Sequence, residues 1–109
     1  MLETLLESKI KEDILLYLFS NGTSYANELA KNFSHNLFAV QNQLKKLEAG
    51  GILYSQLKGK VRLYGLNPRC SFKKELTALL DRVFDLLSDE VKEKYFIKRT
   101  RPRKAGKPL

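Results

Sequence analysis

The sequence predicts a mainly α-helical domain with one small β-hairpin, and three observations lead to this fold class. Apolar residues repeat at helical spacing through most of the chain, but the period changes to two over residues 52–66. The 109 residues are enough for one hydrophobic core and too few for two. With 43% hydrophobic and 29% charged residues, the composition is that of a globular protein.

Four helices are expected in the first half of the chain, and their residue ranges are Leu2–Glu7, Ser8–Phe19, Tyr25–Asn32 and Asn36–Ala49. Ser8 and Asn36 are suitable N-caps for the second and fourth helices, and Thr23 or Ser24 for the third. Gly50 and Gly51 should end the fourth helix, because glycine adopts the conformation that terminates a helix at no steric cost.

A hairpin and two further helices are expected in the second half. The β-branched and aromatic runs Ile52–Leu57 and Val61–Leu66 predict two strands joined at residues 58–60. The helical period then returns from Phe72 to Leu87. Ser88 is the expected cap of a last short helix, Asp89–Phe96.

The formal net charge of +8 is divided into alternating blocks along the chain. Residues 31–74 carry +8 and residues 98–109 carry +6, whereas residues 1–30 and 75–97 carry −3 each. Clustered positive charge favours binding to a polyanion, because neutralised phosphates release their counterions. The first basic block therefore predicts a nucleic-acid-binding face.

The order of the elements is that of a winged helix-turn-helix with extra terminal helices. A three-residue turn at residues 34–36 separates the third and fourth helices, and Ala30 is small where the two helices would cross. We expect residues 1–97 to form this domain and residues 98–109 to form a basic, flexible tail. The tail is interpreted either as an arm that orders on DNA or as a solubilising extension.

The fourth helix is the expected recognition helix. One apolar stripe, Leu37–Val40–Leu44–Leu47, is expected to face the core, and steps of 100° per residue then turn other side chains outward. The predicted DNA-binding residues on this helix are Asn36, Phe38, Gln41, Asn42, Lys45 and Lys46. Amides recognise adenine, lysines reach guanine or phosphate, and an exposed ring can contact a thymine methyl group. An ordinary solvated helix face is the alternative.

The hairpin supplies a second expected contact with DNA. The predicted residues of this wing are Lys58, Gly59, Lys60 and Arg62. A basic tip can contact phosphates or enter the minor groove and so position the recognition helix. The alternative is a charged turn that keeps a sheet edge soluble. Tyr54 and Tyr64 are expected to pack on the sheet.

The segment Ser8–Pro68 resembles the winged helix-turn-helix domain of bacterial and archaeal regulators, and most of all the arsenic-repressor (ArsR) type. The residues that carry the resemblance are Ser8-Lys9, Ile14-Leu15, Glu28-Leu29-Ala30, the run Val40–Leu44–Leu47-Glu48–Gly51-Ile52-Leu53, and Tyr64-Gly65-Leu66-Asn67-Pro68. The resemblance implies a homodimeric transcriptional regulator that binds double-stranded DNA, with residues 36–49 in the major groove. A cytoplasmic location is the default expectation, because one cysteine gives no disulfide framework and the start of the chain lacks a signal-peptide pattern.

Leucine-rich segments near both ends of the predicted domain exceed the needs of one small core and favour a dimer. The expected dimerisation residues are Leu2, Leu5, Leu6, Leu76, Leu79, Leu80, Val83, Phe84 and Leu87. A two-fold dimer would place its recognition helices about 34 Å apart, one turn of DNA. The alternative is a monomer whose long helix packs on its own core.

Metal, cofactor, membrane and enzyme functions are not expected. Thiol-based metal sensors of the ArsR type carry a cysteine pair near the start of the recognition helix, and the stretch Phe33–Asn36 lacks it. Other members bind metal through Asp and His pairs on the last long helix, where Asp81 and Asp85 have no histidine beside them. Cys70 is alone and is expected to be inert, and His35 is expected to pack or to face phosphate. The start of the chain lacks the pattern of a signal peptide, and no catalytic constellation is present.

Sequence-specific binding of duplex DNA is the preferred interpretation, with two alternatives. A winged helix can serve as a protein–protein interaction module, for which the exposed Phe38 would be suited. The basic tail could instead lead non-specific nucleic-acid binding.

Overall fold

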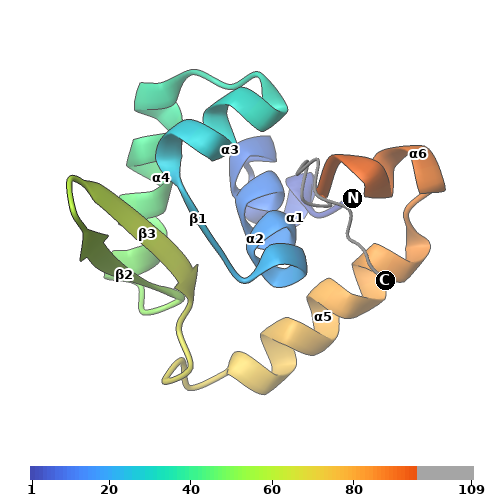
Figure 1. The fold of residues 1–109 in the computed structure, drawn as a ribbon. Helices are drawn as coiled ribbons and strands as arrows, with labels where there is room; N and C mark the ends of the chain where they lie inside the picture. Colours follow the sequence, from blue (N-terminus) through green and yellow to red (C-terminus); the bar gives the residue numbers. More distant parts are fainter. Residues whose placement is uncertain (96–109) are drawn as a thin grey trace, which may run out of the picture.

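The computed structural model describes residues 1–95, and the tail predicted at residues 98–109 lies outside them. The elements are α1 (Glu3–Leu6), α2 (Lys9–Asn21), β1 (Thr23–Tyr25), α3 (Ala26–Phe33), α4 (Leu37–Ala49), β2 (Leu53–Lys58), β3 (Val61–Leu66), α5 (Lys73–Leu86), α6 (Asp89–Lys92) and a final 3-10 turn, η1 (Glu93–Tyr95). Figure 1 shows their arrangement, which is that of a winged helix and confirms the predicted fold class.

Three of the four predicted N-caps are confirmed. Ser8 Oγ accepts a hydrogen bond from the backbone N–H of residue 11 at 3.0 Å, and Asn36 Oδ1 accepts one from that of residue 39 at 3.1 Å. Ser88 Oγ accepts from the N–H of residue 91 at 3.3 Å. Each cap satisfies a donor that the first helical turn leaves without a backbone partner.

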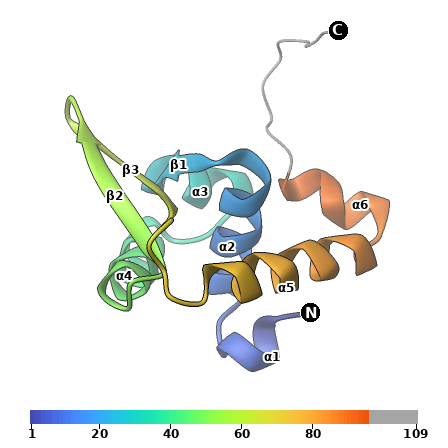
Figure 2. The ribbon, with the colours of Figure 1, turned by 90° about the horizontal axis from the view of Figure 1, so that it is seen from below.

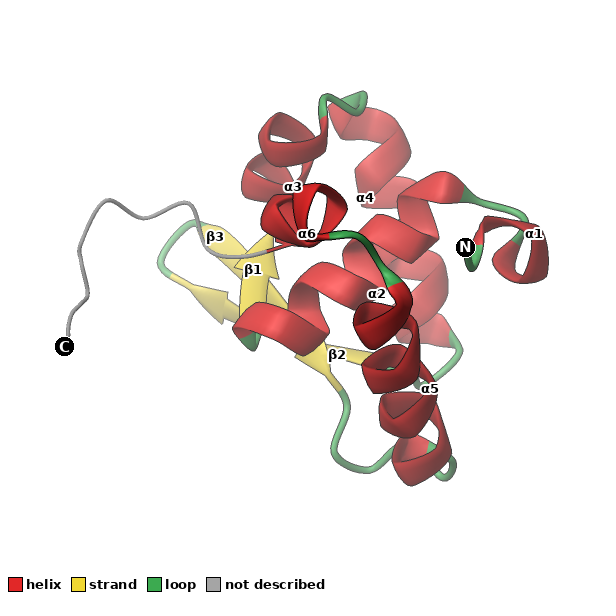
Figure 3. Cartoon of the chain, turned by 90° about the vertical axis from the view of Figure 1, so that its right-hand side faces the viewer, coloured by secondary structure: helices red, strands yellow, loops and turns green. Residues whose placement is uncertain are grey.

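The sheet has three antiparallel strands in the order β1-β3-β2, grouped on one side of the helices in Figure 3. The sequence predicts only two of them, and the prediction that Thr23 or Ser24 caps the third helix is wrong. Residues 23–25 instead pair with β3, Ser24 opposite Tyr64, and α3 begins at Ala26. Pairing with the free edge of β3 satisfies the backbone of a segment too short to show any periodicity.

Helix α2 lies at the centre of the core. All seven residues from Glu12 to Leu18 are buried, and the helix packs against α4, α5, β3 and η1. In Figure 2, α5 runs from the base of the wing along α2 to α6. The buried apolar residues contributed by the other elements include Leu29, Val40, Leu44, Leu47, Leu53, Leu80, Val83 and Tyr95.

The last helix is shorter than the predicted Asp89–Phe96. It ends at Lys92, and the chain tightens into the 3-10 turn η1, while residue 96 is outside the described part. Two asparagines explain this ending, because they satisfy the final carbonyl groups. Asn21 Nδ2 donates to the carbonyl of Tyr95, and Asn32 Nδ2 donates to that of Lys94, each at 2.7 Å.

Two carboxylates of α2 are buried, which the sequence did not predict. Asp13 is 3% exposed; its Oδ1 accepts a hydrogen bond from the Tyr95 hydroxyl and its Oδ2 is bonded to His35 Nε2, both at 2.7 Å. Glu12 Oε2 accepts from the N–H of Leu2 and from the terminal amine of Met1, both at 2.9 Å. These bonds compensate the desolvation of both acids.

Replacing Tyr95 by phenylalanine tests the Asp13 cluster. The variant removes the short hydrogen bond to Asp13 Oδ1 and leaves this buried oxygen only its longer ion pair with Lys9 at 3.4 Å, so the free energy of unfolding should fall by about 1–3 kcal/mol. Urea denaturation measures the change. Tyr54→Phe is the matched control, because this ring is partly exposed, and its effect should stay below about 0.5 kcal/mol. Equal effects of the two variants would contradict the assigned role.

The environment of Glu12 predicts a pH dependence. Burial alone would raise its pKa, but the hydrogen bonds from Leu2 and the terminal amine, together with the charge of Lys9, lower the pKa below the ordinary 4.5. A lowered pKa gives stability that is present above pH 4.5 and lost as the pH falls through the folded-state pKa.

The stability difference between the wild type and Glu12→Gln should therefore be largest near neutral pH and shrink below about pH 4.5. Denaturant titrations over a pH series measure it, with the exposed Glu3→Gln as the control. A difference that does not change with pH would exclude the proposed linkage.

Candidate nucleic-acid interface

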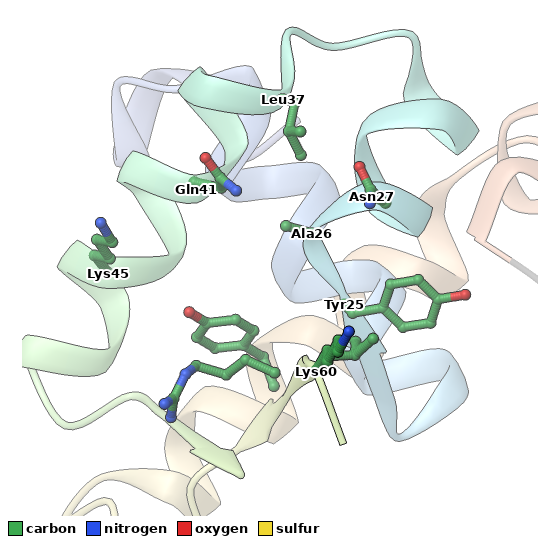
Figure 4. Close-up of a pocket in the computed structure, with 10 residues that line it drawn as sticks. Tyr25, Ala26, Asn27, Leu37, Gln41, Lys45 and Lys60 are labelled. Carbon is green, nitrogen blue, oxygen red and sulfur yellow. The ribbon is translucent and has the colours of Figure 1, made fainter. Parts of the chain in front are cut away.

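A groove of about 380 Å³ lies between α4, the wing and the start of α3. Figure 4 shows Leu37 and Gln41 of α4 on one side of it and Ala26 and Asn27 of α3 on the other, with Lys60 from the wing. Of the described residues, those that line the groove include three cations, Lys45, Lys60 and Arg62, and no carboxylate. The groove is therefore a site of positive potential.

Two rows of side chains, each with a spacing of four residues, divide the exposed surface of α4. Leu37, Gln41 and Lys45 form the groove row, which lines the groove. Phe38, Asn42 and Lys46 form the outer row, which is exposed and does not line it. The predicted recognition residues therefore fall into two sets: Gln41 and Lys45 line the groove, whereas Phe38, Asn42 and Lys46 face solvent outside it.

Leu37 departs from the sequence interpretation, which placed it on the core stripe. Val40, Leu44 and Leu47 are buried as expected, but Leu37 is exposed in the first turn, where the core does not reach. Asn36 is also exposed, and its Oδ1 is engaged in the N-cap. Its Nδ2 group keeps its donors for a ligand.

The predicted wing residues differ in their position relative to the groove. Lys60, in the turn of the hairpin, and Arg62, on β3, line the groove, but Lys58, the last residue of β2, does not. Gly59 at the tip has a φ of 63°, a left-handed conformation that favours glycine. In Figure 2 the tip projects beyond the helices.

Arg62 is held by a chain of hydrogen bonds that begins on α4. Its Nη1 donates to Ser55 Oγ at 3.0 Å, and Ser55 Oγ donates to Glu48 Oε2 at 2.6 Å. Tyr64 lies close to these groups: burial raises its pKa, the charge of Glu48 raises it further, and Arg62 opposes the shift. These hydrogen bonds link the wing to α4 and restrict the guanidinium group of Arg62.

Both predicted tyrosines belong to the sheet, but they differ in exposure. Tyr64 is buried and lines the groove from β3. Tyr54 of β2 is partly exposed, and it lies opposite Gly65, where a Cβ atom would come within 2.8 Å of the ring. The absence of a side chain at Gly65 therefore leaves room for the Tyr54 ring on the outer face of the wing.

The expected dimerisation residues fall into two groups. Leu2, Leu80 and Val83 are buried in the chain's own core, and Leu6, Leu76, Phe84 and Leu87 pack against that core. Leu5 and Leu79 are 69% and 40% exposed. The alternative interpretation, a long helix packed on its own core, therefore accounts for most of this set.

A second apolar row runs along the exposed side of α5. It consists of Phe72, just before the helix, Leu79 and Leu86, spaced by seven residues and all exposed. We call it the α5 stripe. The expected dimerisation residues include only Leu79 of this stripe, together with residues of α5 that face the core.

No group of three or more metal-binding side chains occurs within the described residues. His35, expected to pack or to face phosphate, packs: its Nε2 is bonded to Asp13 and its ring lies 6.2 Å from that of Phe33. Cys70 is a half-buried free thiol. Within residues 1–95, no helix is both long and apolar enough to cross a membrane.

The sequence matches no protein-family model and no curated protein. Solved structures with a similar fold do exist. A variant of MepR from S. aureus has 22% identity and a TM-score of 0.61, covering 85% of this chain and 75% of that one. YusO from Bacillus subtilis has 19% identity and a TM-score of 0.57, covering 85% and 74%.

A third similar structure is ZitR from Lactococcus lactis, described as a zinc-responsive MarR family member. It has 19% identity and a TM-score of 0.52, covering 79% of this chain and 67% of that one. At these identities the likeness extends to the fold, which is the winged helix. The resemblance to the ArsR type stays a prediction.

Proposed function

We propose that this protein is a sequence-specific transcriptional regulator that binds double-stranded DNA. Helix α4 would enter the major groove, and the wing would contact the backbone or the minor groove. The observation that carries the proposal is the groove in which Lys45, Lys60 and Arg62 lie together without a carboxylate among its described lining residues. The winged-helix neighbours, one of them a MarR family member, give supporting context.

The arrangement of charge matches what a DNA strand requires. The cations come from two elements on either side of one groove, so a phosphate backbone lying between them would be contacted from both sides. Tyr25 precedes α3 without a side-chain cap, which leaves first-turn N–H groups at the groove. Helix N-termini favour anions, and this one adds to the lysine and arginine charges.

Binding to duplex DNA should weaken steeply as salt increases, with a linear log–log dependence. Lys45→Ala and Lys60→Ala should each reduce the magnitude of the slope of log K against log salt concentration by about 1, which is the value for one phosphate contact. Fluorescence anisotropy over a salt series measures the slope. Lys58→Ala is the matched control, because this lysine lies at the same tip outside the groove and its removal should change the slope less.

The alternatives give different results in the same measurement. An undetectable or salt-insensitive affinity for duplexes would contradict the proposal and favour a protein–protein interaction module. Deletion of residues 98–109 should leave base preference intact; loss of all binding would indicate a non-specific binder led by the tail.

We further propose that the regulator is a homodimer joined through the α5 stripe. An apolar row exposed at heptad spacing is typical of a helix that pairs with another helix. In an antiparallel pair centred near Leu79, Phe72 faces Leu86 of the second copy. The exposed Glu75 and Arg82 then face each other, whereas a parallel pair would bring like charges together.

Exchanging the charges tests this pairing. Glu75→Arg should weaken dimerisation about tenfold, because two attractive pairs become repulsive, and adding Arg82→Glu should restore it. Leu79→Glu should give a folded monomer. Sedimentation velocity distinguishes the 12.6 kDa chain from its dimer. Asp81→Asn, on a different side of α5, is the control. A monomeric wild type, or no rescue by the double variant, would refute the arrangement.

A further inference from the structure

We propose that Phe38 determines sequence specificity by placing its ring against the 5-methyl group of a thymine. Asn42, one turn later in the outer row, would recognise the adenine of a neighbouring A·T pair. This inference rests on the proposed function and deepens it, since it names the base pairs that α4 recognises: the half-site must contain adjacent A·T pairs.

The exposure of Phe38 is the first observation. Its side chain is 70% exposed, the largest value among the large hydrophobic residues of the described chain. Phe19, Phe33 and Phe84 all belong to ring clusters of the core. Phe38 makes no such contact among the described residues, so folding gives no reason for an aromatic ring at this position.

The placement of Phe38 is the second observation. It is the second residue of α4, and the Asn36 cap holds the turn to which it belongs. The N-terminal residues of a recognition helix are those that reach base edges. Phe38 also lies outside the wing groove, where Lys45, Lys60 and Arg62 are positioned for phosphates. In the proposed complex, the groove row of α4 would therefore contact the DNA backbone, and the outer row would contact the bases.

The neighbours of Phe38 decide between a DNA and a protein partner. The other residues of the outer row are Asn42 and Lys46, and the acid of α4, Glu48, is engaged by Ser55. An apolar ring beside an amide and a cation matches the floor of the major groove at A·T pairs. There the thymine methyl is apolar, and adenine presents one donor and one acceptor that an asparagine can bind together.

Replacing thymine by deoxyuridine tests the inference, because it removes the methyl group and leaves base pairing unchanged. A duplex is first selected from a random pool by the purified full chain, and each thymine is then replaced singly. At one position in each half-site the substitution should weaken wild-type binding about three- to tenfold, the effect of exposing one methyl group. At other positions the affinity should not change.

Phe38→Ala should bind the selected duplex more weakly and should lose the sensitivity to deoxyuridine at that position. Leu57→Ala is the matched control, because Leu57 is an equally accessible apolar residue on the wing, 59% exposed. This variant should keep the sensitivity. Since both side chains are exposed, neither change should disturb folding, and circular dichroism checks this.

The remaining outcomes separate this inference from the proposed function. If the selected duplex binds but no deoxyuridine position matters, or if Phe38→Ala keeps the sensitivity, the role of Phe38 is refuted while DNA binding stands. Selection without any consensus would refute both the role of Phe38 and the sequence specificity of the proposed function, and would leave only non-specific binding of DNA. If no duplex binds at low salt, both the proposed function and the inference fail.

Discussion

The geometry of the candidate interface depends on one buried carboxylate, that of Asp13. A charged group in the core is tolerated only if its oxygens have polar partners. Lys9 forms a local ion pair with Asp13, but the two partners at 2.7 Å come from far along the chain. His35 belongs to the turn before α4, and Tyr95 is the last described residue. The carboxylate therefore links the central helix α2 to the turn that precedes α4 and to η1.

Local signals in the sequence were sufficient for most elements. Ser8, Asn36 and Ser88 were predictable as caps because a cap bonds to an N–H three residues away. Asp13 was not predictable as a buried group, because the partners of its two hydrogen bonds, His35 and Tyr95, are 22 and 82 residues away and a carboxylate on a helix is normally solvated. Strand β1 was missed for the same reason: its partner, β3, lies about forty residues further along the chain.

The candidate site was only partly predictable. Helical periodicity correctly turned Gln41 and Lys45 outward, since 100° per residue is a property of the helix itself. Periodicity does not predict that Lys60 lines the groove and Lys58 does not. The position of each lysine depends on strand register and on where the hairpin lies relative to α4. The same limit applies to α5, where burial by α2 decides which leucines are left on the surface.

The cations of the groove differ in how much freedom they retain, and this difference assigns them different roles. Arg62 is already restrained by Ser55 and Glu48, so binding a phosphate would cost it less conformational entropy. Lys45 and Lys60 are exposed and carry their charges at the ends of flexible side chains. Such charges attract phosphate groups over a distance but give little geometric selectivity. In the proposed complex, Arg62 would therefore fix the register of the wing on the DNA backbone, and the two lysines would supply the attraction that brings the duplex into the groove.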